Sequence, residues 1–150
     1  MQNIAERTVT RSTVDGEITE HTKTSRYKVS SEEDYLKVYI RTMSCLHNVH
    51  GIAVPVLNEL LMRVGYNNQI VLAPSIRQDI ADSVGIKPNT LTRRLTDLCD
   101  AKLLIKEGTN VYTINTYVFG RGKWADILEH RKSLPLKIVF APEGVEFIDE

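Results

Sequence analysis

The segment of residues 79–98, DIADSVGIKPNTLTRRLTDL, constrains the fold more than any other part of the chain. Its apolar residues recur at helical spacing on both sides of Gly85, where a tight turn needs a residue that accepts positive φ. The pattern therefore predicts two short helices joined by a turn. The apolar side chains expected to hold the pair together are Ile80, Val84, Ile86, Leu91, Leu95 and Leu98.

A β-hairpin is predicted directly after the second helix. Residues 103–105 and 111–114 are short apolar or β-branched runs, and the four residues 107–110 between them include Gly108. Helix, turn, helix and hairpin in this order are the parts of a winged helix-turn-helix. In that fold the second helix enters the major groove of DNA and the hairpin contacts its backbone or minor groove. The predicted class is α+β, with this domain at its centre.

The outer face of the second helix carries residue types that read DNA bases. Arginine bonds guanine edges, asparagine bonds adenine edges, and threonine methyls pack on thymine methyls. Because the leucines face inward, the residues predicted on and beside this face are Asn89, Thr92, Arg93 and Thr96, with Lys87, Thr90 and Arg94 at its margins. An exposed Arg-Arg pair alone is more often solvated surface, and it is the order of elements that favours DNA.

Phosphate contacts are expected around this face. Ser75 and Thr90 lie near predicted helix N-termini, which attract anions. Lys106, Thr109 and Asn110 lie on the predicted hairpin, where the same role is open to them.

Residues 1–30 are expected to form a β-hairpin arm. Alternating polar and β-branched residues flank Asp15-Gly16, a pair suited to a tight hairpin turn. The arm has few large apolar side chains and cannot build its own core. It packs on the main domain or on a partner chain, or it is partly disordered when free.

The core domain is expected over residues 31–124. A helix beginning at Ser31 as N-cap and running to about residue 48 comes first, and a second helix spans residues 54–65. A short strand lies within residues 67–73, and Pro74 opens the helix pair. Residues 125–150 complete a last helix and add two short strands. The predicted apolar face of the first helix consists of Leu36, Tyr39, Ile40, Met43 and Leu46.

Charge and composition limit the functional classes. The net charge is zero, but residues 74–124 carry eight basic and five acidic side chains, so any basic surface is local. The apolar runs are far shorter than the roughly 18–20 residues of a membrane span, and the N-terminus does not resemble an export signal. A cytoplasmic protein without a membrane partner is expected, with Cys45 and Cys99 reduced.

The residues around the helix pair also form a recognisable pattern. Tyr66, Asn68 and Ile70 precede the pair, and after the hairpin come Tyr112, Ile114, Asn115, Phe119, Gly120, Arg121, Gly122 and Trp124. Over about residues 54–131 the sequence resembles the RepL-like plasmid replication proteins of bacteria. The resemblance implies sequence-specific binding at a plasmid or phage origin and initiation of replication, and it supplies no catalytic residue. Thr116 departs from the pattern, which usually has proline there.

The tail of this pattern has a physical interpretation. Gly120 and Gly122 permit a tight loop, and Phe119 and Trp124 are expected to pack under it. Arg121 and Lys123 are then left free to reach the DNA backbone.

Enzymatic functions find little support in the residues. The histidines, His21, His47, His50 and His130, do not form the His-hydrophobic-His pair of a metal-dependent nicking enzyme. Cys45, His47 and His50 lie close together, but a second group of zinc ligands does not follow. The sequence also lacks a phosphate-binding loop. We expect no enzymatic activity, cofactor or metal.

Three functions remain open at this point. The first is a replication initiator that binds double-stranded DNA at an origin, and the second is a transcriptional regulator with the same fold. The third is a protein-interaction module. A homodimer is expected, because one short recognition helix reads few base pairs, and host replication proteins are further candidate partners.

Overall fold

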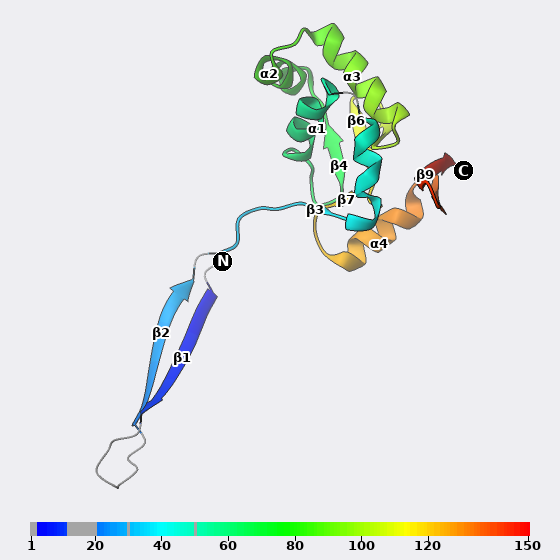
Figure 1. Cartoon of the computed structure of the whole chain (residues 1–150). Coiled ribbons are helices and arrows are strands. Elements are labelled where there is room, and N and C mark those ends of the chain that lie inside the picture. Colours follow the sequence, from blue (N-terminus) through cyan, green and yellow to red (C-terminus); the bar gives the residue numbers. More distant parts are fainter. Residues whose placement is uncertain (1–2, 12–20, 30, 50) are drawn as a thin grey trace. The chain divides into compact units, whose positions relative to one another are not determined.

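The computed structural model describes residues 3–11, 21–29, 31–49 and 51–150 (Figure 1). The chain divides into two compact units, Met1–Asp34 and Tyr35–Glu150. Helices and small antiparallel sheets alternate along it in an α+β architecture. Within the described residues, none of the helices has the length and apolarity needed to cross a bilayer.

The first unit contains the hairpin that the alternating sequence predicts. Strands β1 (Asn3–Arg11) and β2 (His21–Val29) pair antiparallel along their whole length. Asn3 lies opposite Val29, and Arg11 lies opposite His21. The Asp15-Gly16 pair expected in the turn lies outside the described residues.

The helix predicted from Ser31 is wrong in both its start and its type. Strand β3 (Lys37–Val38) pairs with β7 (Phe119–Gly120), and a 3₁₀ helix, η1 (Ile40–Asn48), follows with Tyr39 as N-cap. A 3₁₀ helix has about three residues per turn instead of about 3.6, so the predicted apolar face does not form. Ile40 is 87% exposed and Met43 is 44% exposed.

Helix α1 (Ala53–Leu61) confirms the second predicted helix, although it ends earlier than expected. Val56, Leu57 and Leu60 are buried, as the spacing predicts. Beyond Leu61 the chain continues in turns, and the buried side chain of Val64 still packs into the core.

The predicted helix pair is confirmed as α2 (Pro74–Val84) and α3 (Pro88–Asp100). Gly85 between them has φ 77°, and its N–H and that of Ile86 both donate to the Ala81 carbonyl at 2.9 Å. The residue that ends α2 is thus in the left-handed conformation that favours glycine. Ile80, Leu91, Leu95 and Leu98 are buried, and Val84 and Ile86 are half-buried.

The predicted hairpin is confirmed as β5 (Leu104–Gly108) and β6 (Val111–Ile114). With β4 (Gln69–Val71) it forms an antiparallel sheet in the order β4-β6-β5. Large apolar side chains of the three helices and this sheet make one core. Its fully buried members include Leu60, Ile70, Leu72, Leu91, Leu98, Leu104 and Ile114.

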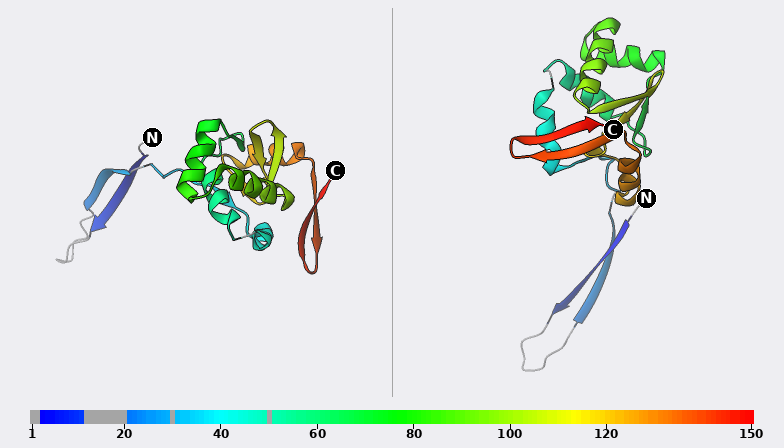
Figure 2. Two further views of the ribbon diagram at one scale, coloured as in Figure 1. Left: turned by 90° about the horizontal axis from the view of Figure 1, so that it is seen from above. Right: turned by 90° about the vertical axis from the view of Figure 1, so that its right-hand side faces the viewer.

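The C-terminal residues form α4 (Trp124–Ser133) and a hairpin of β8 (Leu136–Ala141) and β9 (Gly144–Asp149), as predicted. Strand β9 packs against η1. The turn between α2 and α3 and helix α4 lie at opposite ends of this unit in both Figure 1 and the right-hand view of Figure 2.

Candidate nucleic-acid interface

Helix α3 presents one polar face to solvent. Asn89, Thr92, Arg93 and Thr96 are all exposed, at the spacing of one helix face, while the leucines on the other side of α3 are buried. Arg93 makes no hydrogen bond or ion pair with any of the described residues. Its guanidinium therefore keeps all its donors for a ligand.

The two threonines on this face use their hydroxyl hydrogens inside the helix. Thr92 Oγ1 donates to the Pro88 carbonyl at 3.3 Å, and Thr96 Oγ1 donates to the Thr92 carbonyl at 3.1 Å. These are the i to i−4 bonds that threonine makes within helices. Their hydroxyl donors are thus occupied, and the methyl groups are what these residues offer to a ligand.

Arg77 is part of this surface, although the sequence did not single it out. From the first turn of α2 it donates to Thr92 Oγ1 at 2.9 Å and to Asn110 Oδ1 at 3.3 Å. Asn110 has φ 59° and lies at the tip of the β5–β6 hairpin. One arginine thus connects α2, α3 and the hairpin. Its partners lie 15 and 33 residues away, beyond the reach of any local pattern.

The remaining predicted residues differ in exposure. Thr90 and Asn110 are half-buried, and Arg94 forms an ion pair with Asp97, with 3.3 Å between Nε and Oδ2. The structure thus gives Arg94 a partner within α3. The predicted residues that are exposed on or near the helix pair, on the hairpin and before α4 are Ser75, Lys87, Lys106, Thr109 and Lys123.

Arg121 does not have the free side chain predicted from the sequence. Its guanidinium donates to the Val64 carbonyl and lies over the Tyr66 ring, 4.4 Å from the centroid. Its backbone N–H donates to Asn68 Oδ1 at 2.8 Å, and its carbonyl accepts from Asn68 Nδ2 at 3.2 Å. Asn68 is buried with φ 59°. Tyr66, Asn68 and Arg121 therefore join the segment before the helix pair to the segment after the hairpin.

Gly120 and Gly122, in the segment after the hairpin, allow close packing there. A Cβ on Gly120 would lie 2.7 Å from Ile127 Cδ1 and 3.2 Å from the Tyr39 hydroxyl, and Gly122 has φ 99°. Phe119 is buried as predicted. Trp124 is 48% exposed, so the expectation that it packs under the loop is wrong. As the first residue of α4, it lies against the Tyr39 ring instead, with 5.7 Å between centroids.

The residues of this junction fall within a match to a known family. A family model of Firmicute plasmid replication proteins (RepL) matches residues 3–132. The chain belongs to the RepL family. No curated protein and no solved structure matches it. The resemblance inferred from the residues is thereby confirmed, and the match also includes strands β1 and β2.

Thr116 makes one contact in this RepL chain, through its side-chain hydroxyl, that proline could not make. Its hydroxyl lies 2.9 Å from His130 Nδ1, and its carbonyl accepts from Arg131 Nε at 2.8 Å. Burial lowers the pKa of His130, which favours the neutral ring beside Thr116. The hydroxyl thus ties the loop to α4 at the position where the RepL-like pattern leads one to expect proline.

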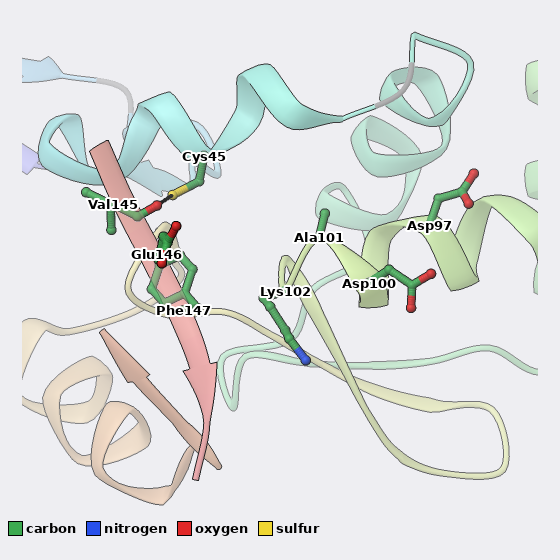
Figure 3. A pocket seen from close by; sticks show the side chains of 8 residues that line it. All are labelled: Cys45, Asp97, Asp100, Ala101, Lys102, Val145, Glu146 and Phe147. Carbon is green, nitrogen blue, oxygen red and sulfur yellow. Dashed lines mark hydrogen bonds between the residues drawn. The ribbon is translucent and has the colours of Figure 1, made fainter. Parts of the chain in front are cut away.

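The C-terminal end of α3 in this RepL chain is acidic. A cavity of about 560 Å³ lies between it and β9, and Asp97, Asp100 and Glu146 line it (Figure 3). Lys102, also at its rim, is paired with Asp149 at 2.7 Å. Carboxylates repel anions, so the acidic end of α3 disfavours an anionic ligand.

The thiol facing this cavity is not activated. Burial raises the pKa of Cys45, and its Sγ donates to the Val145 carbonyl at 3.8 Å. A protonated, buried thiol is a poor nucleophile and a poor metal ligand. The described residues contain no group of three His, Cys, Asp or Glu side chains able to share a metal ion, and His50 lies outside them.

Proposed function

We propose that this RepL-family chain is a sequence-specific double-stranded DNA-binding protein that initiates plasmid replication at an origin. Its domain acts as a winged helix-turn-helix, with α3 in the major groove and the β5–β6 hairpin against the backbone or minor groove. The observation that carries the proposal is the exposed polar face of α3, with Arg93 unengaged among the described residues. Family membership supports the link to replication.

Base reading falls to the residues whose polar groups remain available. Arg93 donates to a guanine edge and Asn89 bonds an adenine edge, while the methyls of Thr92 and Thr96 contact thymine. Arg77 fixes the position of Thr92 relative to the hairpin. Arg94 and Arg121 are left out of the direct contacts, because their guanidinium groups have partners inside the domain.

The residues proposed to contact phosphate lie around these base-reading residues. The exposed lysines bond phosphates as cations, and hydroxyl and amide groups add uncharged donors. The proposed set is Ser75, Lys87, Thr90, Lys106, Thr109, Asn110 and Lys123. The protein positions DNA and needs no catalytic residue or cofactor for this role.

A homodimer is part of the proposal. One helix of 13 residues reads few base pairs, and two copies on paired half-sites supply the selectivity that an origin requires. The β1–β2 hairpin is the proposed surface. Sedimentation of the free protein and of its DNA complex tests this point, and a monomer in both would overturn it.

Selection from random duplex DNA at near-physiological salt tests sequence-specific binding. We expect an enriched motif with paired or iterated half-sites for the unmodified chain. The Arg93→Ala variant should lose preference at one base of each half-site, whereas Lys137→Ala, which removes an exposed cation from β8, should select the same motif. Failure to enrich any motif, without retardation of duplex at low salt, would overturn the proposal.

The initiator role has its own test. A minimal plasmid that carries the enriched motif should replicate only when this protein is supplied in trans. Change of promoter output without any effect on replication would instead indicate a transcriptional regulator with the same DNA-reading surface.

A further inference from the structure

A second cavity lies far from α3 in the unit Tyr35–Glu150. It has a volume of about 320 Å³ and opens between η1, α4 and β8. None of its described lining side chains is a carboxylate. Its walls carry four aromatic rings and two guanidinium groups, those of Tyr39, Tyr117, Trp124, Phe140, Arg41 and Arg131.

Arg131 lines this pocket and lies against three aromatic rings. Its guanidinium carbon lies 4.6 Å from the Tyr39 centroid, 4.9 Å from that of Trp124 and 5.0 Å from that of Tyr117. Its Nε donates to the Thr116 carbonyl at 2.8 Å. Among the described residues, no carboxylate pairs with this cation, so the pocket favours an anionic ligand with a flat surface.

The rim of the pocket is open to solvent. Trp124 and Phe140 are each 48% exposed, although large aromatic side chains are usually more buried. The guanidinium of the exposed Arg41 lies over the Phe140 ring, 3.9 Å from its centroid. A guanidinium stacked on an aromatic ring is thus presented to solvent at the rim.

We propose that this pocket binds an unpaired base of single-stranded DNA together with its neighbouring phosphate. Bases stack on aromatic rings and on guanidinium planes, and arginine pairs with phosphate. The volume is at the lower end of the roughly 300–1,000 Å³ of ligand sites, which suits a base and not a duplex. The inference rests on the proposed function, because opening of an origin produces single strands.

The position of the pocket is compatible with simultaneous duplex binding. Helix α4 lies at the opposite end of the unit from the turn between α2 and α3 (Figures 1 and 2). A duplex read by α3 therefore leaves the pocket available, and the two activities are separable by mutation.

Tryptophan fluorescence of the full chain tests the pocket directly. Trp124 is the only tryptophan of the chain, so its emission reports on this site alone. Titration with oligothymidylate should quench it with saturation, because a base stacks on the indole. A blunt duplex carrying the motif selected by α3 should bind without comparable quenching.

Three variants separate base stacking from general electrostatic attraction. Arg41→Ala should weaken oligothymidylate binding by about tenfold or more and leave duplex binding unchanged. Lys137→Ala is the matched control, since it removes an exposed β8 cation that does not line the pocket, and it should have a much smaller effect. Trp124→Ala, measured by anisotropy of labelled oligothymidylate, should lose affinity to a similar extent as Arg41→Ala.

The outcomes distinguish the pocket from the proposed function. Specific duplex binding without quenching by oligothymidylate would overturn the proposal for the pocket alone. Equal losses of oligothymidylate affinity in Arg41→Ala and Lys137→Ala would do the same. Saturable quenching by oligothymidylate without any specific duplex binding would overturn the proposed function and keep the pocket. Thermal melting of each variant excludes unfolding as the cause, and Arg41→Ala, at an exposed position, is expected to melt like the unmodified chain.

Discussion

Asn89 and Arg93 on α3, and Asn115 and Arg121 after β6, are the same two residue types in opposite environments. Asn89 and Arg93 are exposed. Asn115 is fully buried, its Nδ2 donating to the Lys102 carbonyl at 2.8 Å and its Oδ1 accepting from the Tyr117 N–H at 3.0 Å. Arg121 is bonded to the Val64 carbonyl.

The difference teaches that residue type alone does not separate recognition from structure. A polar side chain whose donors and acceptors are satisfied inside the domain holds segments together, and its loss leaves buried groups unpaired. An exposed side chain without such partners adds little to stability and keeps its bonding groups for a ligand. The α3 face and the segment 115–122 should therefore respond oppositely to mutation.

Asn115→Ala should have the largest effect on folding. It leaves the Lys102 carbonyl and the Tyr117 N–H without their partner, which costs about 2–4 kcal/mol of unfolding free energy. Asn89→Ala, the matched change on α3, should alter stability by less than about 0.5 kcal/mol. Denaturant unfolding of both variants checks this, and equal losses would remove the distinction between the two regions.

Gly120→Ala should come next, at about 1–3 kcal/mol, because the added methyl meets Ile127 Cδ1 at 2.7 Å. Ile127→Val removes that methyl group, so it should cost less in the Gly120→Ala background than in the unmodified chain. A double-mutant cycle measures this coupling. Strictly additive losses would show that the glycine is needed for another reason.

Much of the fold was predictable because its signals are local. Gly85, the leucines of α3 and the alternation in β5 and β6 each specify a turn, a helix face or a strand over a few residues. The prediction of the first helix was wrong for a different reason. Residues 37–39 pair with residues 118–120, and a contact over that separation leaves no periodic trace in the sequence.

The candidate site was predictable only in part for the same reason. The α3 face follows from helical spacing, and its residues are exposed as expected. Arg77 was missed and Arg121 was misassigned, because their roles depend on partners 15, 33 and 57 residues away. Sequence spacing predicts which face a side chain shares, but it does not predict which long-range acceptor its donors find.

Arg93→Ala and Arg121→Ala compare the α3 face with the segment 115–122 through a single residue type, arginine. Arg93→Ala should cost about 1–3 kcal/mol in binding to the selected motif and leave unfolding unchanged. Arg121→Ala should lower stability instead, since it removes the bond to Val64 and the contact with Tyr66. Equilibrium binding and unfolding measured on both proteins check the pair. Loss of motif binding by Arg121→Ala in a fully stable protein would place Arg121 at the DNA.

Lys106→Ala should have the smallest effect, and it tests whether exposure also distinguishes the lysines of the hairpin region. Lys106 is exposed, whereas the ammonium of Lys102 is paired with Asp149 at 2.7 Å. A lysine that contacts phosphate releases about one counterion, so Lys106→Ala should weaken selected and random duplexes alike and reduce the slope of log K against log salt by about one. Lys102→Ala should leave that slope unchanged, because its charge is already neutralised within the domain. If Lys102→Ala reduced the slope and Lys106→Ala did not, the DNA backbone would lie near β9 despite the carboxylates there. The DNA would then contact the acidic C-terminal end of α3, against the proposed orientation.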